Sequence, residues 1–344
     1  MSLRYISILT KKSWAMVVLA ACLLTVTSSA QAQNKETAFQ IQQFRPWLDS
    51  NGMFQTQAGT TIGQWMYSVG LFFNYAKDPL SLRNEQGQRW PNGQIIQHQV
   101  SSDLVAAVGL LNILEVGLRI PMTLYQSGEI SSQNSGFFED SRSRDLSGFA
   151  FSDMMFAVKV QALKEKKHWL NLGFQVYLGI PTGNEDNFNG EDTVSFGLSA
   201  LMNKHFGKFN VGLNLGYRFL PHTKALNLII NHEIFYSLAA SFNIIQNKLQ
   251  AIADLSGATA LSSETSVESA PFELYMGARY YPMKRTDLAL SLGLGVPFMP
   301  GYGTPQIRCL FAISFTPANG FGVQRSAPAP QSAPLPKPVK TSSQ

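Results

Sequence analysis

Residues 170–180 read Leu-Asn-Leu-Gly-Phe-Gln-Val-Tyr-Leu-Gly-Ile, an alternation in which every second side chain is apolar. The same period recurs over residues 209–219 and 287–296, with polar residues or glycine between the apolar ones. A period of two indicates β-strands whose two faces meet different surroundings. These stretches are longer than the usual strand of about five or six residues, and they match the length that a tilted strand needs to cross a bilayer. We therefore predict an all-β fold, a transmembrane antiparallel up-and-down β-barrel.

Twelve segments carry this pattern, and short connections between them alternate with long ones. Aromatic residues such as Trp65, Trp169 and Tyr280 lie at segment ends, where amphipathic rings reach the depth of lipid headgroups. Turns on one side and long loops on the other are typical of bacterial outer-membrane barrels, whose turns face the periplasm. An even number of strands then places both termini in the periplasm. The predicted strands are 65–76, 94–109, 112–124, 150–163, 168–180, 193–205, 209–219, 228–243, 248–258, 270–281, 286–296 and 305–315.

Residues 1–32 are predicted to be a cleaved signal peptide. Basic residues precede an apolar run from Trp14 to Val26, and Ala30-Gln31-Ala32 supplies a small-x-small cleavage pattern. Lipid attachment at Cys22 is the alternative, because residues 19–22 match a lipoprotein processing box. The apolar run continues beyond Cys22, which favours ordinary cleavage after Ala32.

The composition of the remaining chain excludes several classes of protein. The signal segment holds three of the 27 lysines and arginines and no acid, so 24 basic and 22 acidic side chains remain. This near balance argues against nucleic acid as a partner. Cys309 is the one cysteine left, which excludes an internal disulfide. No stretch after residue 32 approaches 18 uninterrupted apolar residues, so a transmembrane helix is not expected.

Two segments flank the predicted barrel of residues 65–317. Residues 33–64 lack a clear strand pattern, and we predict an N-terminal periplasmic or barrel-mouth segment in which Phe39, Ile41 and Phe44 pack into the mouth or form an extra strand. Residues 318–344 are rich in proline and are predicted to be a disordered periplasmic tail. This tail either docks a periplasmic envelope partner through polyproline geometry or acts as a spacer.

Charged residues fall in the polar phase of the predicted strands, which directs them into the lumen. Facing lipid near the midplane, they would cost about 2–4 kcal/mol each. They either set the selectivity of a pore or form an ion-paired network across a narrow interior, and their near balance of sign favours the network. The predicted lumen-lining charges are Asp103, Glu115, Arg119, Asp153, Lys159, Arg218, Glu233, Asp254, Glu273, Arg279 and Arg308.

Other candidate sites are weak. The acidic loop of residues 184–192 offers oxygen ligands for calcium, but its spacing does not fit an EF-hand, so we expect a solvated surface loop. Loop 125–149 could form a constriction, bind a partner or lie on the rim. None of the five histidines stands in a catalytic or metal-binding pattern, and we predict no enzyme, no cofactor and no metal site. Cys309 falls on the apolar face of its strand.

Several short motifs resemble a known family. Trp65 to Leu82, Ile120-Pro121, Ile180-Pro181-Thr182-Gly183 and Gly301-Tyr302-Gly303-Thr304-Pro305 resemble the barrel region of OmpA-like outer-membrane proteins. The chain has a looser likeness to barrels of aromatic-catabolism transporters. That OmpA-like family carries a peptidoglycan-binding domain after a proline-rich linker. This sequence stops within what resembles the linker, so we expect no direct wall binding from such a domain.

These observations predict an outer-membrane barrel that acts as a porin-like channel for small solutes. The alternative is a structural barrel that organises an envelope complex through its proline-rich tail. The expected partners are outer-membrane lipid and lipopolysaccharide, together with the barrel insertion machinery, whose signal resembles the terminal aromatic Phe315 of the last strand.

Overall fold

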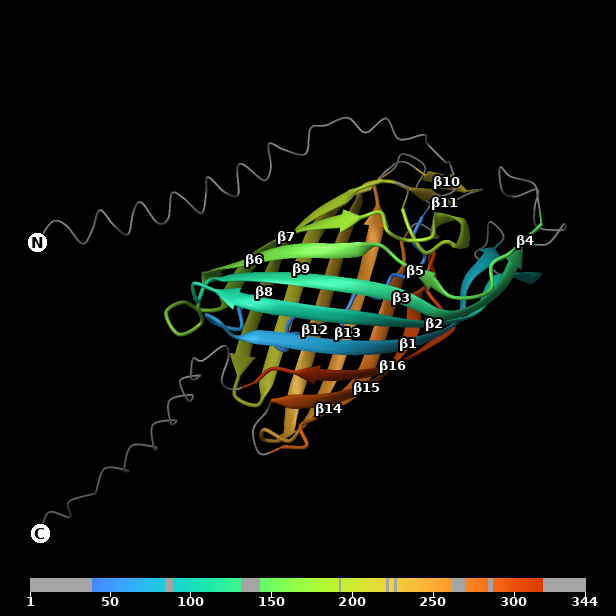
Figure 1. Cartoon of the computed structure of the whole chain (residues 1–344). Helices are drawn as coiled ribbons and strands as arrows, with labels where there is room; N and C mark the ends of the chain where they lie inside the picture. Colours follow the sequence, from blue (N-terminus) through green and yellow to red (C-terminus); the bar gives the residue numbers. More distant parts are fainter. Residues whose placement is uncertain are drawn as a thin grey trace, which may run out of the picture. The chain divides into compact units, whose positions relative to one another are not determined.

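The structure is a computed structural model in which a closed barrel forms the wall (Figure 1). It describes residues 39–83, 89–130, 143–191, 193–220, 223–225, 228–261, 270–283 and 287–317. The predicted signal peptide and proline-rich tail lie outside these residues. Within them, no helix is long and apolar enough to span a membrane.

Twelve antiparallel strands make the wall, and each pairs with its neighbours along the chain. The ring closes because β1 pairs with both β2 and β16. The predicted fold class and strand number are therefore confirmed. The wall strands are β1 (Tyr67–Arg83), β2 (Arg89–Leu110), β3 (Leu114–Ile130), β6 (Met154–Leu163), β7 (Asn171–Ile180), β8 (Ser195–Phe206), β9 (Phe209–Phe219), β12 (Glu233–Ile245), β13 (Leu249–Ala260), β14 (Phe272–Tyr280), β15 (Leu288–Met299) and β16 (Ile307–Phe315).

The first three strands are longer than predicted. Residues 77–93 were expected to form a loop, but β1 continues to Arg83 and β2 begins at Arg89. Asp78-Pro79 interrupts the alternation, and register shifts mark the β1–β2 ladder between Lys77 and Arg83. Bulges of this kind bend a strand without ending it. The bounds predicted from alternation alone were therefore too short for β1 and β2.

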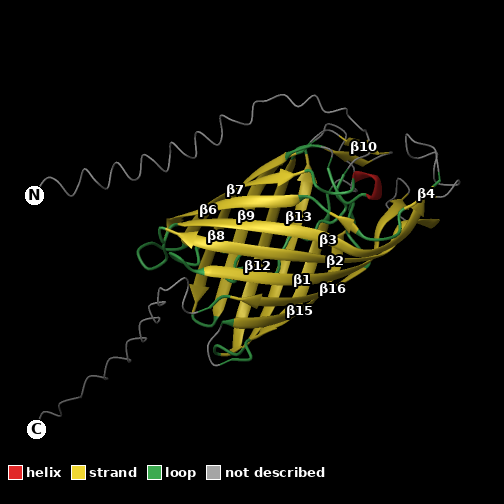
Figure 2. Cartoon of the chain, in the orientation of Figure 1, coloured by secondary structure: helices red, strands yellow, loops and turns green. Residues whose placement is uncertain are grey.

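Short elements lie at the end of the barrel that carries the long loops, which we call the loop end. β4 (Arg144–Asp145) and β5 (Ala150–Phe151) pair with β3 near that rim. Of the predicted loop 125–149, residues 125–130 belong to β3 and residues 131–142 lie outside the described residues. β10 (Thr223–Ala225) and β11 (Leu228–Ile230) form a separate hairpin, which shows that the predicted strand 228–243 is two strands. Figure 2 shows a short helical turn, η2 (Glu185–Asn187), at the same end.

The two faces of the wall differ as the alternation predicts. Leu213 and Leu294 are 43% and 54% exposed on the outer face, whereas Ser199 and Asn214 are buried on the inner face. Trp65 and Trp169 lie at the opposite end, the turn end, and are exposed. Cys309 is exposed among apolar neighbours of β16. The outer face is thus an apolar band that suits lipid.

Residues 39–64, which we call the lumen segment, run through the barrel from the loop end to the turn end. Phe39 packs on Phe188 with ring centroids 5.0 Å apart, next to the loop between β7 and β8. At the other end, the Trp65 amide donates to the Gly109 carbonyl at 2.8 Å, beside the β2–β3 turn. The segment makes one isolated bridge, Gln40–Asn189, and is otherwise not a strand. It therefore lies deeper than the barrel mouth and traverses the whole lumen.

The ends of the described chain consequently lie at opposite ends of the barrel. Val69 pairs with Phe315, so the first and last wall strands begin and end together at the turn end. Phe39 lies at the loop end, against Tyr302. The even strand count predicts correctly that the start of β1 and the end of β16 lie at the same end of the barrel. It does not predict the position of the residues that precede β1.

Apolar side chains of the lumen segment form the core. Phe44, Trp47 and Phe54 pack against wall residues such as Phe72 and Tyr275 in the middle of the lumen. A second cluster, with Phe39, Ile41 and Phe188, covers the loop end. A third, with Ile62, Met66 and Ala107, lies near the turn end. The lumen is packed over much of its length.

Leu213→Arg tests the assignment of the outer face. Leu213 lies near the middle of β9, so a charge there should destabilise the barrel by about 2–4 kcal/mol. Leu111→Arg in the β2–β3 turn is the control, and it should change stability by less than about 1 kcal/mol. Urea unfolding in lipid vesicles measures both. Equal effects at the two positions would contradict the proposed membrane band.

Candidate functional site in the barrel lumen

All eleven charged residues that the sequence directs inward are buried. Eight of them form four ion pairs with N–O distances between 2.6 and 2.9 Å; three pairs join neighbouring strands, and Glu273–Arg308 joins β14 to β16 across β15. The remaining three, Asp153, Asp254 and Arg279, bind backbone groups. The four pairs are Asp103–Arg119, Glu115–Lys159, Glu233–Arg218 and Glu273–Arg308.

Asp254 on β13 is the main anchor of the lumen segment. Its carboxylate accepts hydrogen bonds from the amides of Phe54, Gln55 and Thr56 at 3.0, 2.8 and 2.9 Å. The Thr56 hydroxyl adds a fourth at 2.8 Å. Charge-assisted bonds of this kind are stronger than neutral ones. One carboxylate therefore satisfies three consecutive backbone donors that have no strand partner.

Asparagine and glutamate side chains satisfy the amides that follow. Asn214 accepts from the Gln57 amide at 2.7 Å and donates to its carbonyl at 2.9 Å. Asn203 accepts from the Gly59 amide at 3.1 Å, and Glu115 accepts from the Ile62 amide at 3.0 Å. The wall thus supplies a series of acceptors along the path of the segment toward the turn end.

Lysine and arginine side chains bind the acidic and carbonyl groups of the segment. Lys159 forms ion pairs with Asp49 of the segment and with Glu115 of β3, the latter at 2.9 Å. Arg279 donates to the Met53 carbonyl at 2.9 Å. Asp49 is therefore a second carboxylate that binds Lys159, beside Glu115, and it ties the segment to β3 and β6.

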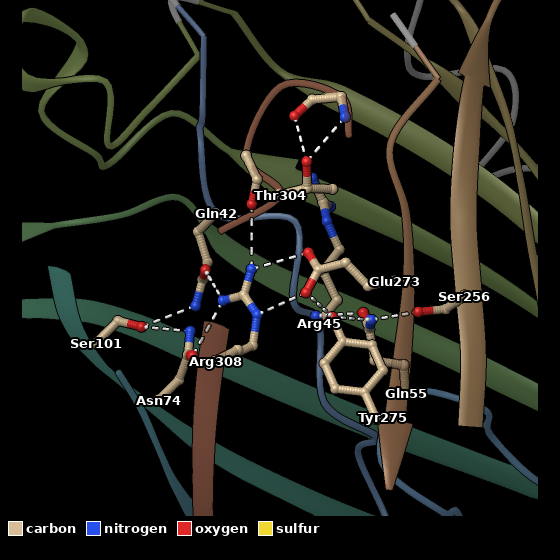
Figure 3. Close-up of polar contacts among 12 residues, drawn as sticks. Gln42, Arg45, Gln55, Asn74, Ser101, Ser256, Glu273, Tyr275, Thr304 and Arg308 are labelled. Carbon is tan, nitrogen blue, oxygen red and sulfur yellow. Dashed lines mark hydrogen bonds and ion pairs between the residues drawn. The ribbon is translucent and has the colours of Figure 1, made fainter. Parts of the chain in front are cut away.

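Arg308 joins the segment to three wall strands near the loop end (Figure 3). Its guanidinium lies between Glu273 on one side and Gln42 and Asn74 on the other, with bonds of 2.9, 3.1 and 3.0 Å. Gln42 in turn donates to Ser101 at 2.8 Å. The Nε and both Nη atoms of Arg308 therefore all donate to oxygen acceptors, as the buried donors of a guanidinium require.

Two glycines allow the segment to lie close to the wall. A Cβ at Gly109 would lie 1.9 Å from the Gly63 carbonyl oxygen. A Cβ at Gly293 would lie 2.6 Å from Cζ of Phe54. Both distances are too short for any side chain, so these lumen-facing glycines accommodate the inserted segment.

The acidic loop of residues 184–192 is only partly the solvated loop that was expected: Asn184 and Asp186 are exposed, whereas residues 188–191 are buried. Phe188 and Asn189 are buried, and the Asn189 side chain hydrogen-bonds to Gln126 and Thr123 of β3. Asp153 accepts from the amides of Gly183 and Glu191 at 2.8 and 2.7 Å. An inward-folded loop needs partners for its backbone, and these wall side chains provide them. The loop helps to close the loop end.

Glu191 in this loop is buried, and its pKa is raised to about 7 by that burial, with the Arg45 charge acting in the opposite direction and the Asp153 charge in the same direction. Its Oε2 atom has no hydrogen-bond partner within the described part of the chain. The carboxyl therefore changes charge near neutral pH beside the lumen segment.

One cavity, which we call the lumen cavity, remains beside the segment. It has about 810 Å³ of atom-free space, part of it continuous with solvent. Wall strands β6 to β9 and β12 to β14 line one side and the lumen segment lines the other. Its lining includes Arg45, Gln57, Gln175, Tyr177, Phe235 and Tyr275.

Sequence reasoning missed the neutral side chains and the partner residues of the segment. Asn203 and Asn214 alternate in the polar phase of β8 and β9, so their inward direction was readable. The hydrogen bonds of Asn203 and Asn214 to the backbone could not be predicted, because they depend on the segment that crosses the lumen. Asp49 and Gln42 lie in a stretch with no strand pattern, which gave no signal of where they lie.

A family model matches residues 100–304, and its description is "Putative MetA-pathway of phenol degradation". This match covers more than half of the chain. The chain belongs to this family. Among curated proteins, none matches it.

Solved structures with a similar fold are outer-membrane channels. The COG4313 outer membrane channel from Pseudomonas putida F1 has a TM-score of 0.56 and 14% identity, with 75% of this chain and 97% of that one covered. The NanC porin has a TM-score of 0.47 and 8% identity, with 72% and 98% covered. The first likeness shows the fold, a porin-like barrel of the outer-membrane type.

These comparisons do not support the resemblance to OmpA-like proteins, and they do support the looser likeness to aromatic-catabolism barrels. Two of the motifs behind the OmpA-like resemblance, Trp65 to Leu82 and Ile120-Pro121, lie mainly in the wall strands β1 and β3. Within the described residues, no group of three or more His, Cys, Asp or Glu side chains could hold a metal ion. The structural neighbours are channels rather than enzymes.

Asp254→Asn tests the anchor of the lumen segment. Loss of the charge weakens four hydrogen bonds, so the free energy of local opening at residues 53–57 should fall by at least about 2 kcal/mol. Hydrogen exchange followed by mass spectrometry measures it. Asp145→Asn on β4 is the matched control and should leave these amides protected. Unchanged protection in Asp254→Asn would contradict the anchoring role.

Glu191→Gln tests the buried carboxyl. Because the folded-state pKa of Glu191 lies above its ordinary value of 4.5, the folded state loses stability as pH rises from about 4.5 to about 7. The glutamine variant lacks this loss. It should match the unaltered protein at pH 4 and exceed it by about 1–3 kcal/mol at pH 8. Urea midpoints at the two pH values measure this. An equal difference in stability between the two proteins at pH 4 and at pH 8 would show a steric cause instead.

Proposed function

We propose that this protein is a porin-like channel of the bacterial outer membrane for small solutes. The observation that carries the proposal is the closed barrel with polar side chains on its inner face, in which about 810 Å³ of atom-free space, part of it open to solvent, remains beside the inserted segment. The fold shared with an outer-membrane channel supports it. The family description adds aromatic compounds to the solutes to be tested.

The proposed orientation follows bacterial barrels, with turns in the periplasm and long loops outside. Phe39 then lies at the outer end and the lumen segment descends toward the periplasm. Solutes entering from outside first meet the apolar cluster of Phe39, Ile41 and Phe188. They next reach the lumen cavity beside Arg45 and Arg218.

The lumen-lining charges have two roles in this proposal. Most hold the segment or one another, as the four ion pairs and the Asp254 bonds indicate. Arg45, Arg218 and Glu273 also line the cavity and would meet a passing solute. The narrow space beside the segment then limits flux and size far more than an open porin would.

Proteoliposomes that contain the full chain test the channel. They should swell in small uncharged solutes and in small aromatic acids, and a planar bilayer should show stable but small conductance. The control is the same lipid with heat-denatured protein. A barrel that migrates as folded on a gel, yet passes neither ions nor any of these solutes, would overturn the proposal.

A further inference from the structure

The lumen cavity is lined by an arginine whose buried Nε atom lacks a hydrogen-bond partner, by two glutamines whose Oε1 atoms also lack one, and by aromatic rings. We infer that it binds a small aromatic carboxylate that also carries a hydroxyl group. This inference deepens the proposed channel function and rests on it for the route by which the ligand enters. Its argument comes from three sets of atoms around the cavity.

Arg45 of the lumen segment supplies the positive charge. Its Nε atom is buried and has no hydrogen-bond partner in the residues that the structure describes. Its backbone amide is held by Gln55 Oε1 at 2.7 Å, which fixes the residue beside the cavity. Arg218, on the same cavity, is already paired with Glu233 at 2.8 Å. A carboxylate in the cavity would give the Arg45 fork the acceptor that it lacks.

Two glutamines supply acceptors for a hydroxyl. The Oε1 atoms of Gln57 and Gln175 are buried, line the cavity and have no donor among the described residues. Gln175 is only 4% exposed, on the inner face of β7. Leaving a buried acceptor unpaired costs about 1–3 kcal/mol. A hydroxyl group can donate to such an oxygen, whereas a carboxylate cannot.

Aromatic side chains complete the wall. Tyr177, Phe235 and Tyr275 line the cavity, and Tyr177 and Phe235 lie 6.4 Å apart between ring centroids. The Arg218 guanidinium lies 5.4 Å from the Phe235 centroid, which holds that ring in place. Flat rings stack well in such a site.

The three sets of atoms select one ligand class. Phenol has the ring and the hydroxyl but no charge for Arg45. Benzoate has the ring and the charge but no donor for the glutamines. An aliphatic acid lacks the ring. A hydroxybenzoate carries all three features, and 4-hydroxybenzoate is therefore the probe.

Isothermal titration calorimetry of the full chain in detergent tests the inference. We expect saturable binding of 4-hydroxybenzoate, at least about tenfold tighter than that of benzoate or phenol. Arg45→Met should weaken the binding of 4-hydroxybenzoate by a similar factor and leave the binding of phenol unchanged. Arg45→Lys should retain part of the affinity for 4-hydroxybenzoate. Gln57→Met and Gln175→Met should reduce the preference for 4-hydroxybenzoate over benzoate. Lys248→Met, an exposed change in the β12–β13 turn, is the control.

Equal binding of the three probes, or no saturable binding, overturns the inference on the unaltered chain alone. If Arg45→Met binds 4-hydroxybenzoate as tightly as the unaltered chain, the assigned anion partner is wrong. Permeation is measured separately in proteoliposomes. Solute entry without binding overturns the cavity assignment and keeps the channel. Binding without entry of any solute overturns the channel and keeps the site.

Discussion

An extended chain buried inside a barrel needs a hydrogen-bond partner for each backbone amide, and the structure depends on how that need is met. The lumen segment has one isolated bridge in place of a strand ladder. Side chains of the wall therefore act as its partners, above all Asp254 and Asn214. Each unpaired buried donor would cost about 1–3 kcal/mol. Wall and segment are thus mutually dependent, because removing either leaves buried polar groups without partners.

This dependence explains the balanced charges of the lumen. Four ion pairs bridge wall strands, and Asp49 from the segment supplies a second carboxylate for Lys159. The same insertion fills the middle of the barrel with Phe44, Trp47 and Phe54, and it leaves the remaining space on one side. Any solute route therefore runs beside the segment, where the buried Nε atom of Arg45 has no hydrogen-bond partner among the described residues.

The strands could be predicted from sequence because lipid and lumen impose opposite requirements on alternate side chains. Residues 209–219 have the predicted bounds for that reason. The rule failed at residues 77–93, where Asp78-Pro79 interrupts the alternation but bulges keep the ladder intact. The alternation also predicted that Asp254 points into the lumen, but it did not predict that Asp254 binds the backbone of residues 54–56. The path of residues 39–64 depends on side chains distant in sequence, so no local pattern could reveal it.

The central claim is that the lumen segment occupies the barrel and restricts passage through it. Single-channel conductance of the full chain, compared with a variant that lacks residues 43–60, tests it most directly, provided that both migrate as folded barrels. The account predicts several-fold larger conductance for the variant, since the packed centre of the lumen becomes water-filled. Equal conductance from two folded barrels would contradict it.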